Sequence, residues 1–146
     1  MSNKLKVKIK KIHPDAIMPT YATEGAAAFD LYAVNGGIVP VMGSLVVGIG
    51  ISLEIPDDHV MRIYGRSGHG FNYDVSLANS VGIIDSDFRG EIKVKLSNFG
   101  AKRMLVNVGD RIAQAIIEPI PRVEFEWVDD LSDTERGDGG FGSTGK

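Results

Sequence analysis

The chain has 146 residues, a formal net charge of -3 at pH 7 and a sequence pI of about 5.6. This length fits one domain that buries roughly 70% of its unfolded surface, and the acidic balance excludes a general nucleic-acid binder, because affinity for phosphate backbones depends on clustered Lys and Arg. The chain contains no cysteine, which excludes disulfides and thiolate metal sites, and its 18 glycines favour tight turns over long helices.

Alternation of apolar and polar residues recurs along the chain and predicts half-buried strands. The alternating apolar positions are Leu5, Val7 and Ile9; Ile49, Ile51, Leu53 and Ile55; Ile92, Val94 and Leu96; Met104, Val106 and Val108; and Val123, Phe125 and Trp127. Lysines interleave with the first of these groups, so we interpret those lysines as one solvated strand face.

Turn signals separate the predicted strands at 35–37, 56–58, 98–100 and 108–110. This spacing is typical of an all-β, jelly-roll-like barrel or sandwich. A short helix is expected only near residues 71–79. We expect residues 1–130 to form the β domain and residues 131–146 to form a flexible arm.

The segment Gly82–Ile92 combines an apolar strand end, two acids, an aromatic residue and an arginine. Its turn formers and the alternation that follows predict a β-hairpin with Asp85 beside Phe88 at its mouth. Two interpretations remain open for these residues alone. They form a nucleotide site, or the acids only shape the turn while Phe88 plugs a core edge and Arg89 pairs with a neighbouring acid.

Polar groups suited to phosphate and base recognition occur on both sides of that segment. Arg66, Ser67 and Gly68 offer a charged fork, a hydroxyl and free backbone N–H groups, although such a tripeptide is also common in plain loops. Asn79 can read the polar edge of a base, or can instead be a buried residue satisfied by its own backbone.

The arm has a single large apolar residue among its last ten, Phe141, and many glycines. Such a tail cannot fold onto its own core, so it is expected to order only against a ligand or a neighbouring subunit. Its glycine patterns fail the context tests for a Rossmann fingerprint and a Walker loop. With Arg136 beside it, contact with phosphates is favoured over a plain flexible tail, and Phe141 can stack on a base.

The three histidines are scattered and predict no zinc site. The first residues contain no apolar run long enough for a signal peptide or a membrane span. We therefore expect a soluble intracellular protein, cytoplasmic if the source is bacterial and inside the host cell if it is viral.

Five ordered segments together resemble the trimeric dUTPase family, from Ala27 to Gly145. They are Ala27–Ala33, Arg66–Gly68, Gly82–Ile92, Gly109–Gln114 and Arg136–Gly145. The resemblance implies a homotrimer with sites at subunit boundaries that converts dUTP and water to dUMP and pyrophosphate. This reaction limits uracil incorporation into DNA and supplies dUMP for dTMP synthesis.

The resemblance also implies the chemical roles. Asp85 is the general base for the attacking water and the partner of the sugar 3′-hydroxyl, whereas Asp87 is structural. Mg²⁺ is the cofactor, held chiefly by the three phosphates, and Asp30 contacts it through water unless it is only a strand-end capping acid.

The same resemblance implies the substrate contacts. Arg66, Ser67, Gly68 and Gln114 face the phosphates. Asn79 and the backbone of Gly82 and Ile84 read uracil, and Phe88 packs on the deoxyribose. From another subunit, the arm brings Phe141 over the uracil, with Arg136, Gly142 and Ser143 near the outer phosphates.

Four residues, at three places, depart from the family pattern. Gly65 replaces a usual Pro, His69 and Gly70 replace a small apolar pair, and Phe88 replaces a usual Tyr. The first two loosen the loop, and the third removes a hydroxyl. Two rival functions remain, a dCTP deaminase of related fold and a nucleotide-gated interaction protein without turnover.

Overall fold

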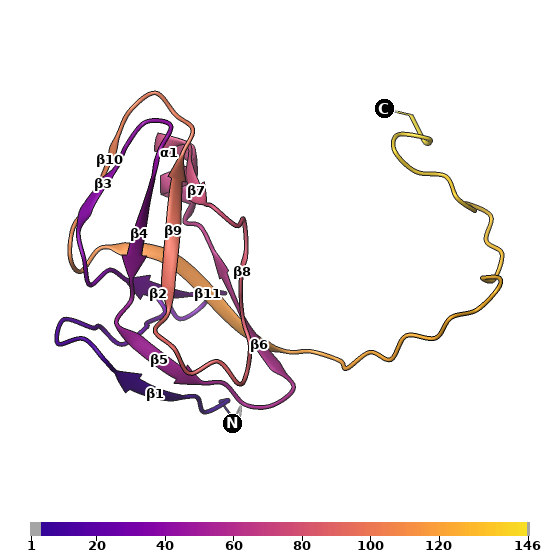
Figure 1. The fold of residues 1–146 in the computed structure, drawn as a ribbon, viewed down its shortest axis with the longest axis horizontal. Coiled ribbons are helices and arrows are strands. Elements are labelled where there is room, and N and C mark those ends of the chain that lie inside the picture. The colour runs from indigo at the N-terminus through magenta and orange to yellow at the C-terminus, as the bar shows by residue number, and fades with distance from the viewer. Residues whose placement is uncertain (1–3, 146) are drawn as a thin grey trace.

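The computed structural model describes residues 4–145, which form a β-rich body and a long arm (Figure 1). The elements are β1 (Lys8–Lys11), β2 (Phe29–Tyr32), β3 (Gly37–Val39), β4 (Ser44–Gly48), β5 (Ile51–Glu54), β6 (His59–Tyr64), α1 (Ser67–Tyr73), β7 (Val75–Leu77), β8 (Gly82–Ile84), β9 (Lys93–Asn98), β10 (Met104–Val106) and β11 (Arg111–Pro119). The expectation of a mostly β protein is confirmed.

The strands pair into small antiparallel sheets. One sheet has the order β2-β11-β6-β8, a second has the order β4-β9-β7, and the pairs β1-β5 and β10-β3 complete the described part of the chain. These sheets are open in the described residues, so a closed barrel is not what this chain forms. Most neighbours in a sheet are distant in sequence.

The core lies where the inner faces of these sheets meet. Alternation places Val94, Leu96 and Asn98 of β9 inward, while Lys93 and Lys95 face solvent. Leu31, Ile63 and Ile112 are almost completely buried from the other sheet. Lys8 and Lys10 of β1 are exposed, which confirms the solvated strand face predicted at the start of the chain.

The predicted hairpin at residues 82–92 is wrong. β8 pairs with β6, with Ile84 opposite Met61, whereas β9 pairs with β4 and β7. Only the turn itself is confirmed, since the amide of Phe88 donates to the carbonyl of Asp85 at 3.2 Å. Ile92 is buried and exchanges backbone hydrogen bonds with the β5 region, so residues 85–92 pass from one sheet to another instead of folding back.

The predicted helix is shorter and earlier than expected. α1 covers Ser67–Tyr73, and the following residues form β7 instead of more helix. Asp74 ends α1 in a left-handed conformation, with φ of 54°. A residue in that conformation terminates the helix and lets the chain turn directly into a strand.

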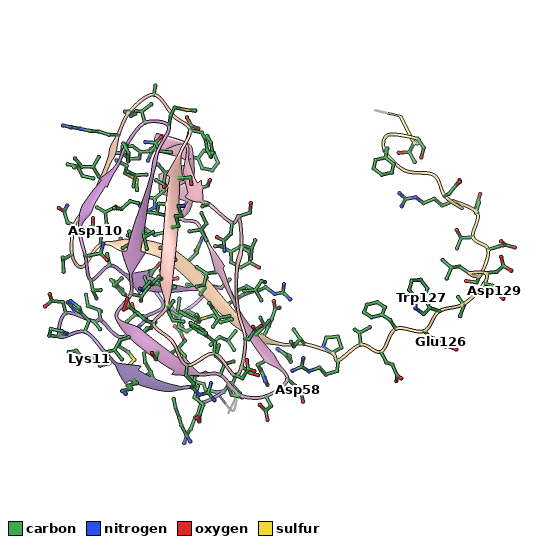
Figure 2. All side chains as sticks on the ribbon, viewed as in Figure 1. Lys11, Asp58, Asp110, Glu126, Trp127 and Asp129 are labelled. Atoms are coloured by element: carbon green, nitrogen blue, oxygen red, sulfur yellow. The ribbon has the colours of Figure 1, made fainter. Side chains whose placement is uncertain are left out.

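The alternating group Val123, Phe125 and Trp127 does not form a strand. Residues 121–130 carry no regular secondary structure, and Phe125 and Trp127 are 93% and 102% exposed. Figure 2 shows Glu126, Trp127 and Asp129 on the arm, well away from the body, beyond the point marked by Asp58 where the arm leaves. Alternation predicts a strand only where a partner strand is available to complete its hydrogen bonds.

Buried Asn98 ties the loop after β9 to the end of β3 and should be a main determinant of stability. Its Nδ2 donates to the carbonyls of Val39 and Lys102, and its Oδ1 accepts from the amide of Gly100. We expect Asn98→Ala to lower the free energy of unfolding by about 2–4 kcal/mol, because it strands buried polar groups.

The measurement is urea unfolding at one fixed protein concentration. Asn72→Ala, at an exposed position of α1, is the matched control and should change stability by less than about 0.5 kcal/mol. Equal effects of the two substitutions would contradict this role of Asn98.

Candidate functional site

The loop between β6 and α1 borders a hollow of about 560 Å³. The residues that line it are Gly65, Arg66, Ser67, Gly70, Phe71, Asp74, Val75, Ser76, Leu77, Ser80 and Gln114. Three of the predicted phosphate ligands, Arg66, Ser67 and Gln114, therefore share one cavity. Gly68 follows directly in the first turn of α1, where it is exposed.

Asp30 anchors the cationic side of this hollow. Its carboxylate is 3.9 Å from Nε of Arg66 and 3.8 Å from Nη1 of Arg111, and its side chain is 11% exposed. The two arginines therefore offset the cost of placing this carboxylate in a largely buried position. Asp30 lies inside β2, so the alternative of a strand-end capping acid is wrong.

Gln114 is fixed by the centre of the four-stranded sheet. In β11 it lies opposite Asp30 of β2 on one side and Tyr64 of β6 on the other. Its Nε2 donates to the carbonyl of Gly65 at 3.0 Å, and Nη1 of Arg66 donates to the carbonyl of Arg111 at 3.2 Å. These bonds hold the loop against β11, so the freedom that Gly65 adds is restrained.

The charges and donors of this hollow suit an anion with several oxygens. Arg66 is the cation of the lining and Asp74 is its acid, while Arg111 shares the Asp30 carboxylate with Arg66 outside the lining. The Ser67 hydroxyl and the Gln114 amide add neutral hydrogen-bonding groups. A phosphate chain presents the matching acceptors.

A second hollow, of about 350 Å³, lies between β8 and β9. Asn79, Gly82 and Ile84 line it, together with Leu77 and Lys95. A Cβ at Gly82 would lie 3.1 Å from Cβ of Ile63, so the backbone approaches β6 closely there. Asn79 is exposed, which excludes the alternative of a buried asparagine satisfied by its own backbone.

Asp85 and Phe88 lie on the exposed turn after β8. Arg89 pairs with Glu54, its Nη2 being 3.6 Å from Oε1, as one interpretation of the turn expected. The β6-β8 register sets Asp85 beside Val60, six residues before Arg66, which corresponds to roughly 20 Å along an extended strand. Within one chain, Asp85 is therefore not brought to the hollow that holds Arg66 and Ser67.

The C-terminal arm runs away from the β body (Figure 1), and none of its described residues lines either hollow. Arg136 donates through Nε to the carbonyl of Gly139 at 2.8 Å, and Ser143 donates through its amide to the carbonyl of Gly140. Phe141 has a φ of 51° and Gly142 a φ of 89°. Phe141 is fully exposed.

Sequence reasoning missed Arg111 and His69 as parts of the site. Arg111 follows the turn at Gly109 and Asp110, and its contact with Asp30 depends on a register shift in β11 that no local pattern reveals. His69 stood out only as a departure from the family pattern. In the described part of the chain, its buried Nδ1 has no hydrogen-bond partner.

Among residues 4–145, no three side chains of the metal-binding types gather into one group. The described residues also contain no helix with the length and hydrophobicity of a membrane span.

Together the sheets and the hollow at Arg66 define a class, an all-β protein with a polar cavity beside its four-stranded sheet. The dUTPase family model matches residues 14–145, and the chain belongs to that family. This confirms the resemblance seen in the sequence, and the enzyme is a dUTP diphosphatase.

Two relatives illustrate the likeness. The deoxyuridine 5′-triphosphate nucleotidohydrolase of Helicobacter pylori strain J99 is 45% identical over 141 residues, covering 97% of each chain. That of Wolinella succinogenes is 41% identical over 143 residues, covering 98% of this chain and 96% of the relative.

Solved structures share the fold. The dUTPase of Staphylococcus bacteriophage 80alpha with dUpNHpp matches with a TM-score of 0.87 and 23% identity, over 98% of this chain and all of that one. A mutant dUTPase of phage phi11, described with a structural Mg(II) ion, matches with a TM-score of 0.79 and 18% identity, over 87% of this chain and 99% of that one.

His69 makes the stability of the protein depend on pH. Its pKa lies below the ordinary value of 6.5, because burial disfavours the charged imidazolium and Arg66 repels it, while Asp110 offsets part of the effect. As the pH falls, His69 therefore binds a proton at a higher pH in the unfolded chain than in the folded chain. The full contribution of His69 to the free energy of unfolding is present above pH 6.5. This contribution is lost as the pH falls toward the lower pKa of the folded state.

We expect the wild type to lose more stability between pH 7.5 and pH 5.5 than His69→Gln does. Thermal unfolding at the two pH values measures the difference, with His59→Gln as a control at a position bonded only to a neighbouring carbonyl. Identical pH dependence in wild type and His69→Gln would contradict the assignment.

Proposed function

We propose that hydrolysis of dUTP proceeds by attack of an Asp85-activated water on the α-phosphorus, at sites shared between copies of the chain in a homotrimer. The observation that carries this proposal is the separation of Asp85 from the hollow that contains Arg66, Ser67 and Gln114. One copy contributes the phosphate-binding groups, and another contributes the turn with the base. The number three comes from the family resemblance.

The hollow at Arg66 takes the triphosphate. Arg66 offers a charged fork, Gly68 contributes free backbone around the loop, and Gln114 is already oriented by its bond to Gly65. Ser67 contacts the bridging region between the α- and β-phosphates. Positioning of this kind, with charge neutralisation, supplies most of the catalysis in reactions of phosphate esters.

The hollow at Asn79 takes the uracil base. Its lining combines apolar side chains with the amide of Asn79 and the backbone of Gly82 and Ile84, as small-ligand sites commonly do. A close backbone wall excludes the methyl group of thymine and mismatches the amino group of cytosine. Phe88 packs on the deoxyribose and leaves no room for a 2′-hydroxyl.

Mg²⁺ fits as a cation carried mainly by the substrate. Asp30 lies behind Arg66, and two arginines already hold it, so it suits contact through a water rather than direct ligation. Mg²⁺ keeps several waters and seldom needs a cage of protein ligands. When bound, the ion neutralises negative charge on the phosphates.

The arm closes the site of another copy. It leaves the body at the end of β11, where Ile120 bonds to Asp58, and runs outward with its aromatic side chains exposed. Phe141 stacks on the uracil, and Arg136, Gly142 and Ser143 approach the outer phosphates. In the described chain this arm begins after Ile120, ahead of the boundary expected at residue 131, and its final part, residues 131–146, is the segment that closes the site.

The reaction balances with groups from the chain. Asp85 accepts a proton from water as the water oxygen bonds to the α-phosphorus. The bond from that phosphorus to the bridging oxygen breaks, and pyrophosphate leaves with the electron pair. The 3′-hydroxyl of the sugar also bonds to Asp85, which aligns the nucleotide with the base.

We expect Asp85→Asn to lose on the order of 10²–10⁴ in turnover while still binding dUTP, as removal of one general base does. Pyrophosphate release is followed with Mg²⁺ and, separately, dUTP, dTTP, dCTP and UTP. Asp87→Asn is the matched control on the same turn and should keep most of the activity.

Near-normal turnover of Asp85→Asn would refute the assignment of the base. Ammonia released from dCTP would instead favour the deaminase. Binding of dUTP by the wild type without pyrophosphate would favour a nucleotide-gated interaction protein.

A further inference from the structure

We propose that Glu54 and Arg89 are positioning residues, which together hold the turn that carries Asp85 and Phe88. The proposal rests on the proposed function, because it concerns the placement of the base assigned there. It adds to that function two side chains that touch neither the substrate nor the reacting atoms.

The turn needs such support because it is outside the sheets. β8 ends at Ile84 and β9 begins at Lys93, and in the described chain the residues between them belong to no strand. The bond from the Phe88 amide to the Asp85 carbonyl closes the turn. Backbone groups that lack a sheet partner are commonly satisfied by side chains or water.

Arg89 supplies part of that support. Its Nη1 donates to the carbonyl of Ser86 at 2.6 Å and to the carbonyl of Phe88 at 3.3 Å. One guanidinium group therefore links both sides of the turn that follows Asp85. A planar fork with several donors is suited to this, and a lysine offers a single point of contact.

Glu54 fixes Arg89 to the body. It ends β5, a strand anchored by the buried Leu53 and paired with β1, and its Oε1 is 3.6 Å from Nη2 of Arg89. Its other oxygen is 3.2 Å from Nζ of Lys8. Because such exposed ion pairs add little to stability, their value here is geometric.

The same turn orients Phe88. A Cβ placed at Gly90 would lie 2.5 Å from Cζ of Phe88, so the ring folds back over that glycine. Movement of the turn would displace both the base and the wall that excludes a 2′-hydroxyl. We call the Glu54–Arg89 pair the brace. Loss of the brace is expected to change both the turnover rate and the preference for deoxyribose over ribose, a combination that a purely structural role would not produce.

The test compares Glu54→Gln, Arg89→Met and Arg89→Lys with Lys8→Met in the full-length protein. Lys8→Met removes the other partner of Glu54 without touching the turn, so it is the matched control. We expect about a tenfold lower kcat in Glu54→Gln and Arg89→Met, since small misplacements of reacting groups cost this much or more. The kcat of Arg89→Lys should lie between the kcat of these two variants and that of the wild type.

In the first two variants the preference for dUTP over UTP should also narrow, with KM for dUTP within about twofold of the wild type. The control should keep the kcat and the preference of the wild type. Melting temperatures identify any variant that fails to fold, and Glu54→Gln decides the outcome if Arg89→Met does not fold.

Wild-type kcat and preference in folded Glu54→Gln and Arg89→Met would overturn the proposal. Asp85→Asn is assayed in parallel to separate the two ideas. If Asp85→Asn is inactive while Glu54→Gln and Arg89→Met keep the wild-type kcat and preference, only the positioning role of Glu54 and Arg89 is refuted. If Asp85→Asn is itself active, the proposed function fails.

Discussion

The pairing of β6 with β8 determines how the rest of the site is organised. β6 lies between β11 and β8, and its two ends serve different groups. At the Tyr64 end it leads into Arg66 and Ser67, and at the Val60 end it lies beside Asp85. Because a strand is rigid and extended, these groups cannot meet within one chain without breaking the sheet. The proposed sharing of the site between copies rests on that constraint.

The phosphate hollow depends on a different arrangement, in which β11 gathers three segments. Gln114 lies between Asp30 and Tyr64, and Arg111 begins the same strand just before a register shift. The buried Asp30 carboxylate then orients both arginines, because each is its partner. Removing one member of such a cluster leaves a poorly solvated charge, so the cluster acts as a unit.

Local features of this fold could be predicted from the sequence, and long-range pairing could not. Alternation identified β5, β9 and β10, and the turn at Asp85 was found from its acids and serine. The prediction of a hairpin at residues 82–92 is wrong because alternation indicates which face of a strand is buried and does not indicate which strand it pairs with. The strand expected at Val123 failed for a related reason, since the described arm has no neighbouring strand beside it.

The difference between local patterns and long-range pairing also applies to the candidate site. Arg66, Ser67 and Gln114 line one hollow, although in the sequence only the family resemblance connects Gln114 with the other two. The ion pair of Asp30 with Arg111 spans strands distant in sequence, so no spacing rule reveals it. Burial of His69 likewise depends on what packs around α1.

Mixing two damaged chains tests the shared site most directly. Asp85→Asn and Arg66→Gln are each expected to be nearly inactive, and they are unfolded together in equal amounts and refolded. If the base and the arginine come from different copies, about a quarter of the sites in random assemblies regain both groups, and the mixture recovers a similar share of wild-type turnover. A mixture no more active than the two variants assayed separately would contradict the account.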